Sequence, residues 1–385
     1  MRRFTLAFLW AGFLTLTATV AAAQEVEIIH IRLGQGDGTL ILGPEADDGS
    51  RVSVLIDAGG IPIMGRDAGR IVGAVLHKNG VKELDFIIVT HYDADHIGGI
   101  VAGNSDDHGH SFLLGPNNVP GAEGDDDGDG EADWIGSAQT KLMPDADELG
   151  LDDDVTVGTF VDRGDVSAPT SIARTKYVNM VTATGAARIS LEDQDDVEGF
   201  EIDLGDGATM QCLTANGFVR DRSSRVANVN TENERSLCFL LTYGGFHYLT
   251  GGDTIGRSFG SENAKVEKAI GEFLVDNEIN VDVLHVNHHG GNNASEADFL
   301  SLIQPEIAVI SLGNDNGHHH PNVNVLKRLI AAGVYRIYQT SWGTTRGSMP
   351  EEVRRHQAIF QQDIVIRATE SDFEVSTTRT FATDD

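Results

Sequence analysis

The residues best suited to chemistry lie in one short segment, Thr90–Gly99, whose sequence is THYDADHIGG. The segment holds two histidines, His91 and His96, and two carboxylates, Asp93 and Asp95. Bringing such ionisable groups together costs free energy unless something neutralises them. Imidazole and carboxylate both bind zinc, manganese or iron well, so the segment predicts a centre for two divalent metal ions. A polar surface turn is the alternative.

Further groups of the same chemical types follow predicted strands. The first segment comes after a buried apolar run at residues 85–89, and three later groups also come after apolar runs. These groups are Asp253, the pair His288 and His289, and the run His318 to His320. A single histidine after a strand is usually structural, but loops around a rigid sheet collect into sites. The repetition predicts that these groups join the first segment.

The elements that position these groups read as alternating strands and helices. Besides residues 85–89, strands are predicted at residues 26–33, 40–42, 52–56, 236–242, 246–249, 281–286, 307–312, 335–338 and 364–368. Helices are predicted at residues 66–79, 265–278, 295–303 and 323–332, the third one capped by Ser295. The turn Gly34–Gly38 is not a nucleotide-binding loop, because it lacks the P-loop lysine and strands flank it. The chain is therefore of the α/β class.

Residues from about 104 to 200 differ in composition, being rich in Asp, Gly, Ser and Thr, and are interpreted as an acidic insertion. Within them a calcium loop is predicted, because acidic side chains occupy its positions 1, 3, 5 and 9 and Gly130 its position 6. The calcium ligands would be Asp125, Asp127, Asp129 and Asp133. Position 12 is Gly136 and not a glutamate, and a solvated acidic linker is the alternative.

The N-terminus predicts export. A basic start, an apolar run at residues 4–20 and three alanines at 21–23 form a signal peptide of residues 1–23. An uncleaved membrane anchor is the alternative. The remaining domain, residues 24–382, would be periplasmic or secreted, with no later segment apolar for long enough to span a bilayer. A disulfide between Cys212 and Cys238 is allowed there, and two buried thiols are the alternative.

The charge of the chain limits its partners. Its 385 residues carry a formal net charge of −31. Nonspecific binding to nucleic acid is largely electrostatic, so tight binding of this kind is not expected. A phosphate ester can still be a substrate, because bound metal ions reverse the local sign of the field. The sequence does not predict an oligomeric state.

Taken in order, these motifs resemble a metallo-β-lactamase-fold hydrolase. Within that superfamily, the chain is similar to the C-terminal hydrolase domain of ComEC-type DNA-uptake proteins and to their secreted relatives. The matching pieces are Leu33–Asp37, Leu55–Gly59, His91–Gly99, Asn233–Leu241, Thr250–Asp253, Asp282–Leu284, His288–Gly290, Ser311–Gly313 and His320–Pro321. The resemblance implies an α/β fold, a four-layer αβ/βα sandwich, with a metal site at one edge.

The resemblance also implies a set of ligands. His91 and His288 would hold one metal ion, with Asp93 nearby, where the superfamily more often has a second histidine. Asp95, His96 and His320 would hold the other ion, and Asp253 would bridge the two. His289 is the alternative to His288, and His318 or His319 is the alternative to His320.

Two metal ions about 3.5–4 Å apart can activate a water and clamp both oxygens of a phosphoryl displacement. The predicted catalytic residues are Asp93 and Asp95, with Asp93 orienting the attacking hydroxide or acting as general base. Asp57 and Asp37 are candidates for orienting histidine ligands, or are ordinary turn residues.

We therefore expect a secreted phosphodiesterase or nuclease that uses two divalent ions, zinc or else manganese or iron. A hydrolase of another bond, such as a β-lactam, lactone or other ester, is an alternative, because the fold does not fix the chemistry. A non-catalytic calcium-binding surface protein is another. Arg220, Arg222 and Arg225 form the nearest basic cluster, which could hold a substrate phosphate or lie in a solvated loop.

Overall fold

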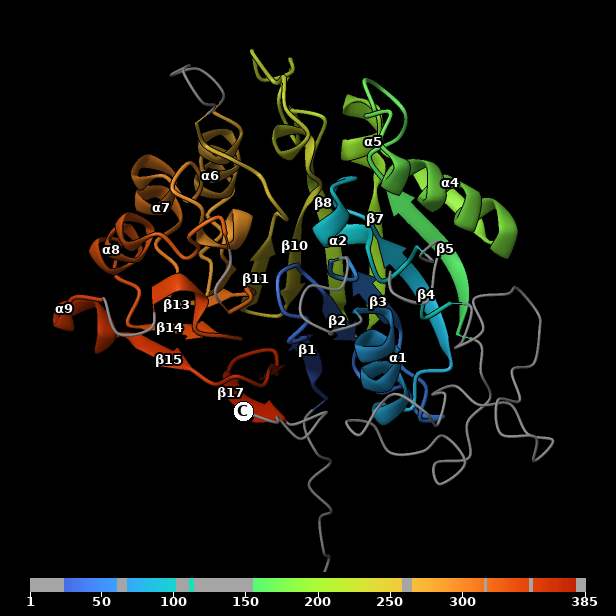
Figure 1. Cartoon of the computed structure of the whole chain (residues 1–385), viewed down its shortest axis with the longest axis horizontal. Coiled ribbons are helices and arrows are strands. Elements are labelled where there is room, and N and C mark those ends of the chain that lie inside the picture. Colours follow the sequence, from blue (N-terminus) through green and yellow to red (C-terminus); the bar gives the residue numbers. More distant parts are fainter. Residues whose placement is uncertain are drawn as a thin grey trace, which may run out of the picture.

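The computed structural model describes residues 24–60, 68–101, 111–113, 155–257, 265–314, 317–345 and 349–378. The predicted signal peptide and the predicted calcium loop lie outside these residues. Within them, two β-sheets stand next to each other with helices on their outer sides (Figure 1). In the same residues, no helix combines the length and the apolarity needed to cross a membrane.

The first sheet holds strands in the order β17-β16-β1-β2-β3-β4-β5-β6. These strands are β1 (Val26–His30), β2 (Thr39–Leu42), β3 (Ser53–Ile56), β4 (Glu83–Ile88), β5 (Thr156–Asp162), β6 (Ala187–Ser190), β16 (Asp363–Ala368) and β17 (Phe373–Thr378). Neighbours from β3 to β6 run parallel. Both faces of β2 and β3 are buried, which is why their sequences show no polar alternation.

The second sheet has the order β15-β14-β13-β12-β11-β10-β8-β7, with β9 paired to β8. Its strands are β7 (Glu201–Gly205), β8 (Ala208–Ala215), β9 (Phe218–Val219), β10 (Cys238–Tyr243), β11 (Phe246–Thr250), β12 (Val283–His285), β13 (Ile307–Ile310), β14 (Arg336–Gln339) and β15 (Gln357–Ile359). The neighbours from β11 to β15 run parallel. Each parallel strand needs a crossover connection, which the helices supply.

Helices cover the outer face of each sheet (Figure 1). The longer ones are α1 (Ala68–Lys78) and α4 (Ile172–Thr184) on the first sheet, and α6 (Val266–Asp276), α7 (Ala297–Ile303) and α8 (Val323–Ala331) on the second. Shorter elements are α2 (Ala94–Ile97), α5 (Gln194–Gly199), α9 (Glu351–Arg354) and the 3₁₀ turns η1 (Asn233–Arg235), η2 (Asn287–Gly290) and η3 (Gly343–Thr345).

Three apolar cores lie between the layers. Val72 of α1 belongs to the core between the first sheet and its helices. Ile41 and Leu241 belong to the core between the two sheets. Leu284 and Phe299 belong to the core between the second sheet and α6 to α8. Helix, sheet, sheet and helix therefore form the four-layer αβ/βα sandwich that the resemblance implied, and this prediction is confirmed.

The described part of the predicted insertion differs from an inserted loop region. Strand β5 pairs with β4, and β6 pairs with β5, so residues 155–200 extend the first sheet. The pattern of apolar and polar residues in this segment did not predict a strand, because β6 lies at the sheet edge, where none of its residues is fully buried. The predicted cap of α7 is also off by one residue: Glu296 is the N-cap, and Ser295 has a φ of 50°.

Cys212 and Cys238 are both free and buried, on the neighbouring strands β8 and β10. The alternative of two buried thiols therefore holds. Burial raises the pKa of the Cys212 thiol to about 12, so it stays protonated at neutral pH and is a poor nucleophile.

Candidate metal centre

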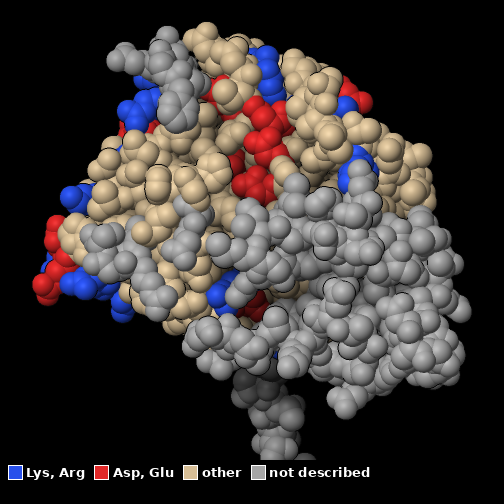
Figure 2. Space-filling view, in the orientation of Figure 1, with Lys and Arg blue, Asp and Glu red and all other residues tan. Residues whose placement is uncertain are grey.

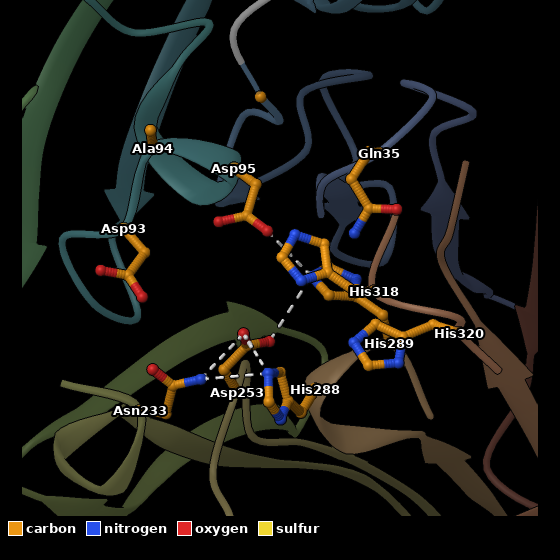
Figure 3. A pocket seen from close by; sticks show the side chains of 11 residues that line it. Gln35, Asp93, Ala94, Asp95, Asn233, Asp253, His288, His289, His318 and His320 are labelled. Carbon is orange, nitrogen blue, oxygen red and sulfur yellow. Dashed lines mark hydrogen bonds and ion pairs between the residues drawn. The ribbon is translucent and has the colours of Figure 1, made fainter. Parts of the chain in front are cut away.

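Loops from both sheets meet around one cavity, which has a volume of about 390 Å³. The loop after β4, the loop after β11 and the turn η2 after β12 supply most of its walls. Figure 3 shows the side chains that line it. They include Asp93, Asp95, Asp253, His288, His289 and His320. The structure therefore gathers the groups that the sequence placed after separate strands.

The two histidines of the first segment are oriented by groups behind them. Asp57 Oδ2 lies 2.7 Å from His96 Nδ1 and accepts a hydrogen bond from Thr90 Oγ1 at 2.7 Å. Because the Thr90 hydroxyl donates to Asp57, its oxygen can accept from His91 Nδ1, 3.1 Å away. Both rings are thus protonated at Nδ1, which leaves each Nε2 lone pair available. This supports the predicted orienting role of Asp57.

The histidines of η2 are held in the same way. His289 Nδ1 lies 3.0 Å from the carbonyl oxygen of Ser311, and His288 Nδ1 lies 3.0 Å from Asn293 Oδ1. The backbone at both histidines is left-handed, with φ of 53° at His288 and 50° at His289. Such a conformation costs free energy for residues other than glycine and is typical of functional sites.

The four Nε2 atoms converge on the two oxygens of Asp253. Oδ1 lies 3.2 Å from His96 Nε2 and 3.6 Å from His289 Nε2. Oδ2 lies 3.6 Å from His288 Nε2 and 3.9 Å from His91 Nε2. We call these two groups the Oδ1 side and the Oδ2 side. Each side has two imidazole nitrogens and one carboxylate oxygen, which is a metal-ligand set.

Several of these atoms lack an ordinary partner. The buried Nε2 atoms of His91, His96 and His289, and Oδ1 of Asp253, have no hydrogen-bond partner among the described residues. Buried polar atoms are nearly always hydrogen-bonded, so a cluster of exceptions requires an explanation. Imidazole nitrogens and a carboxylate oxygen that face one another are suitable ligands for divalent metal ions.

Asp93 and Asp95 complete the two sides. Asp93 Oδ2 lies 3.6 Å from His91 Nε2, on the Oδ2 side, and its side chain is 46% exposed. Asp95 Oδ2 lies 3.5 Å from His289 Nε2, on the Oδ1 side, and its side chain is 33% exposed. Each carboxylate therefore lies close to a histidine of the centre and is also exposed to the cavity.

The structure changes the predicted grouping at one histidine. His289, rather than His320, lies beside His96 on the Oδ1 side, with ring centroids 5.3 Å apart. The His320 ring lies farther out, with its centroid 5.4 Å from that of His288 and 6.3 Å from that of His289. His318 stacks on His320 at 5.8 Å. These two rings border the cavity.

The charges at the site neutralise one another. Burial opposes the ionised form of Asp253, but His96, His288 and His289 outweigh burial and hold the pKa of this carboxyl well below its ordinary value. Burial also opposes charge on His289, yet Asp253 and Asp95 raise its pKa to about 10. A metal ion that binds here would therefore displace protons from imidazolium groups.

Two polar residues of the site were not among the predicted ligands. Asn233 Nδ2 lies 3.3 Å from Asp253 Oδ2 and 3.2 Å from His288 Nε2 (Figure 3). Gln35 lines the cavity from the turn after β1. Both belong to motifs that carried the resemblance, which was the signal that could have identified them.

The predicted arginine cluster lies elsewhere. Arg222 pairs with Glu272 of α6, and Arg220 Nε donates a hydrogen bond to the Cys212 carbonyl oxygen at 2.9 Å. Arg225 Nε donates one to the Asn216 carbonyl oxygen at 2.5 Å. None of the three lines the cavity, whose described lining contains no Lys or Arg. Acidic side chains gather near the middle of the face in Figure 2.

Comparison with known proteins supports this architecture. The Metallo-beta-lactamase superfamily pattern matches residues 39–102. ComE operon protein 3 of Bacillus subtilis (strain 168) is 25% identical over 318 residues, which cover 80% of this chain and 31% of that protein. Competence protein ComA of Neisseria gonorrhoeae is 30% identical over 113 residues, 29% of this chain and 15% of that protein. The chain thus spans a third or less of these relatives.

Solved structures that match this chain are similar to it at low sequence identity. A diphosphatase of the PhnP family is 14% identical, with a TM-score of 0.34, over 77% of this chain and 89% of that chain. A metal-dependent hydrolase of the β-lactamase superfamily is 9% identical, with a TM-score of 0.34, over 87% of this chain and 96% of that chain. The chain thus has the four-layer sandwich of the metallo-β-lactamase fold, matches the pattern of that superfamily over residues 39–102, and is similar to ComE operon protein 3 and competence protein ComA.

Proposed function

We propose that the protein is a metal-dependent hydrolase of phosphodiester bonds that acts outside the cytoplasm. The observation that carries the proposal is the placement of Asp253. Each of its oxygens faces a separate pair of imidazole nitrogens, at 3.2 and 3.6 Å on one side and 3.6 and 3.9 Å on the other. One carboxylate shared by two ligand sets is the arrangement expected for two metal ions close together.

The residues of the site have different roles in this proposal. When bound, two divalent ions supply Lewis-acid stabilisation to the attacking and leaving oxygens of a phosphoryl group. Asp93, the more exposed of the two candidate carboxylates, is placed to orient a water or accept its proton. Asp95 lies beside His289 and serves as a ligand. Asn233 and Gln35 offer amide groups to the substrate from the cavity wall.

A phosphodiester is favoured because the motifs resemble the hydrolase domain of ComEC-type DNA-uptake proteins and the chain is similar to ComE operon protein 3 and competence protein ComA. The cavity lacks lysine and arginine among its described lining residues. Metal ions would therefore supply the positive charge that an anionic ester needs. This arrangement favours a small or single-phosphate contact over tight binding along a nucleic-acid backbone.

The test is hydrolysis of bis(p-nitrophenyl) phosphate by protein loaded with zinc or with manganese. The variant His96→Ala removes a ligand, and His356→Ala, a histidine outside the cavity, is the matched control. Loss of an outer partner of a ligand costs about 10–100-fold, so loss of the ligand should cost about 100-fold or more in kcat/KM. His356→Ala should keep wild-type activity.

The other outcomes separate the alternatives. An active, metal-free His96→Ala protein would refute the mechanism. No turnover with two metal ions bound, measured by elemental analysis, would indicate another scissile bond. No turnover and no bound metal would favour the non-catalytic surface protein.

A further inference from the structure

A third carboxylate borders the Oδ1 side of the centre. Asp37 lies in the glycine-rich turn between β1 and β2 and is only 3% exposed. One ligand atom from each of Asp37, His96, Asp253 and His289 lies within 4.8 Å of the others. The Nε2 atoms of His96 and His289 are buried there without a hydrogen-bond partner among the described residues. Asp37 therefore adjoins the space that these nitrogens share.

The backbone fixes Asp37 to the loop that carries Asp95. The Asp37 amide donates a hydrogen bond to the Asp95 carbonyl oxygen at 3.1 Å, and the Gly59 amide donates one to the Asp37 carbonyl oxygen at 2.5 Å. At Gly36, whose φ is +134°, an added Cβ would lie 2.5 Å from the Asp95 carbonyl oxygen. Only glycine allows this approach. The turn thus holds Asp37 in a fixed place beside the other ligands.

A buried histidine from the second sheet contacts the Asp37 carboxylate. His285 Nε2 lies 3.2 Å from Asp37 Oδ1 and 3.0 Å from Ser311 Oγ. Its Nδ1 lies 3.1 Å from Thr250 Oγ1, so the ring is held from both ends. An ionised carboxylate has two acceptor oxygens, and His285 leaves capacity on it for a further partner. A buried carboxylate needs such partners to offset its lost hydration.

We propose that Asp37 is a further carboxylate ligand on the Oδ1 side and makes that side selective for a hard divalent ion such as Mn²⁺. The proposal rests on the metal centre proposed above. The donors of the Oδ1 side are then Asp37, Asp95, Asp253, His96 and His289. Five donor groups exceed the four that zinc usually takes. Oxygen-rich ligand sets suit Mn²⁺, whereas imidazole-rich sets suit Zn²⁺.

The experiment measures metal binding and not turnover. Metal-stripped protein is titrated with MnCl₂ and separately with ZnCl₂ by isothermal titration calorimetry, and free Mn²⁺ is counted by electron paramagnetic resonance. The variant is Asp37→Asn, which keeps the backbone hydrogen bonds and the side-chain shape. The matched control is Asp282→Asn, which removes a half-buried carboxylate outside this cavity.

We expect wild-type protein and Asp282→Asn each to bind two Mn²⁺ ions, with the same Kd values in both proteins. In Asp37→Asn one Mn²⁺ should remain, and the Kd of the other should rise at least about tenfold. The Kd for Zn²⁺ should rise less than that for Mn²⁺. Equal Mn²⁺ binding by Asp37→Asn and wild type would overturn the proposed role of Asp37 but not the metal centre. A wild-type protein that binds no metal would overturn the centre itself.

A second measurement guards against misfolding of the variant. A crystal structure of the Mn²⁺-loaded wild-type protein should show an Asp37 oxygen in the coordination sphere of the ion on the Oδ1 side. An Asp37 carboxylate bonded only to His285 would overturn the proposal. It would assign Asp37 to positioning His285 instead.

Discussion

At the scale of single residues, the centre depends on which nitrogen of each histidine carries the proton. Asp57, Thr90, Ser311 and Asn293 each lie within 3.1 Å of one Nδ1 atom. Four separate acceptors therefore give the same result, in which Nε2 is the nitrogen that faces the centre. Because all four histidines present the same ring nitrogen to the centre, they can act together as one ligand set.

Asp57→Asn tests this orientation. Asparagine tolerates the left-handed backbone at this position, where φ is 55°, so the loop should keep its shape. The amide cannot accept from His96 Nδ1, Thr90 Oγ1 and the Thr90 amide as the carboxylate does. We expect metal affinity to fall about 10–100-fold. Competition with a chelator measures it.

Asp48→Asn, at an exposed aspartate that accepts hydrogen bonds from Ser50, is the control for the loss of one charge. Its metal affinity should equal that of the wild type. If Asp57→Asn also kept wild-type affinity, the orienting role of Asp57 would be wrong.

At the scale of elements, the turn η2 is held in place by α6. Glu267 of α6 accepts hydrogen bonds from Asn287 Nδ2 at 2.8 Å, the Ser295 amide at 2.5 Å and the Glu296 amide at 3.0 Å. Asn287 immediately precedes the two histidines. Burial outweighs these hydrogen bonds and raises the pKa of the Glu267 carboxyl to about 7.

This raised pKa predicts a pH dependence of stability. Between about pH 4.5 and 7 the folded state keeps a proton on Glu267 that the unfolded state has released. The free energy of unfolding therefore falls as pH rises through this window, by up to about 3 kcal/mol from this group. Glu267→Gln should lack this contribution. Urea unfolding at pH 5 and pH 8, in the presence of a chelator, measures the difference.

The exposed Glu352→Gln serves as the matched control and should keep the wild-type dependence on pH. If wild type and Glu267→Gln lost equal stability between the two pH values, Glu267 would be ionised in the folded protein across the whole range.

Elements with strong periodicity were the predictable ones. The predicted helices at 66–79, 265–278 and 323–332 correspond to α1, α6 and α8, and the buried runs correspond to β1 to β4 and β10 to β13. Residues 155–200 were missed because β5 is exposed over its first half and α4 shows little amphipathic pattern. Strand β5 is fixed by its pairing with β4, and β6 by its pairing with β5, and the local sequence does not reveal these contacts.

The site was predictable as a set of residue types and less so as a geometry. His91, Asp93, Asp95, His96, Asp253 and His288 all lie around the centre that the sequence suggested. His289 was predicted only as an alternative to His288, and its place beside His96 depends on left-handed backbone at η2, which spacing along the chain does not reveal.

At the scale of the whole molecule, the centre joins the two sheets. Asp37, His91 and His96 come from loops of the first sheet, whereas Asp253 and His289 come from loops of the second. Because the ligands converge only in the folded sandwich, a metal ion binds the folded state and not the unfolded chain. Binding free energy then adds to folding free energy.

Removal of metal should therefore lower the Tm. A ligand present at about 1,000 times its Kd stabilises the folded state by about 4 kcal/mol. Calorimetry with Mn²⁺ and with a chelator measures the shift, and Asp253→Asn should abolish most of it, while His356→Ala should retain it. Equal Tm values for the metal-loaded and stripped wild-type protein would contradict a centre that bridges the sheets.

The shared position of Asp253 has a consequence for how the centre fills. An ion bound on one side would fix the Asp253 carboxylate in its present orientation and so hold the other oxygen toward the opposite side. The first ion thus prepares the site for the second, which is positive cooperativity between positions. Half-filled molecules should then be scarce, and the protein should pass between an empty and a full form over a narrow range of metal concentration.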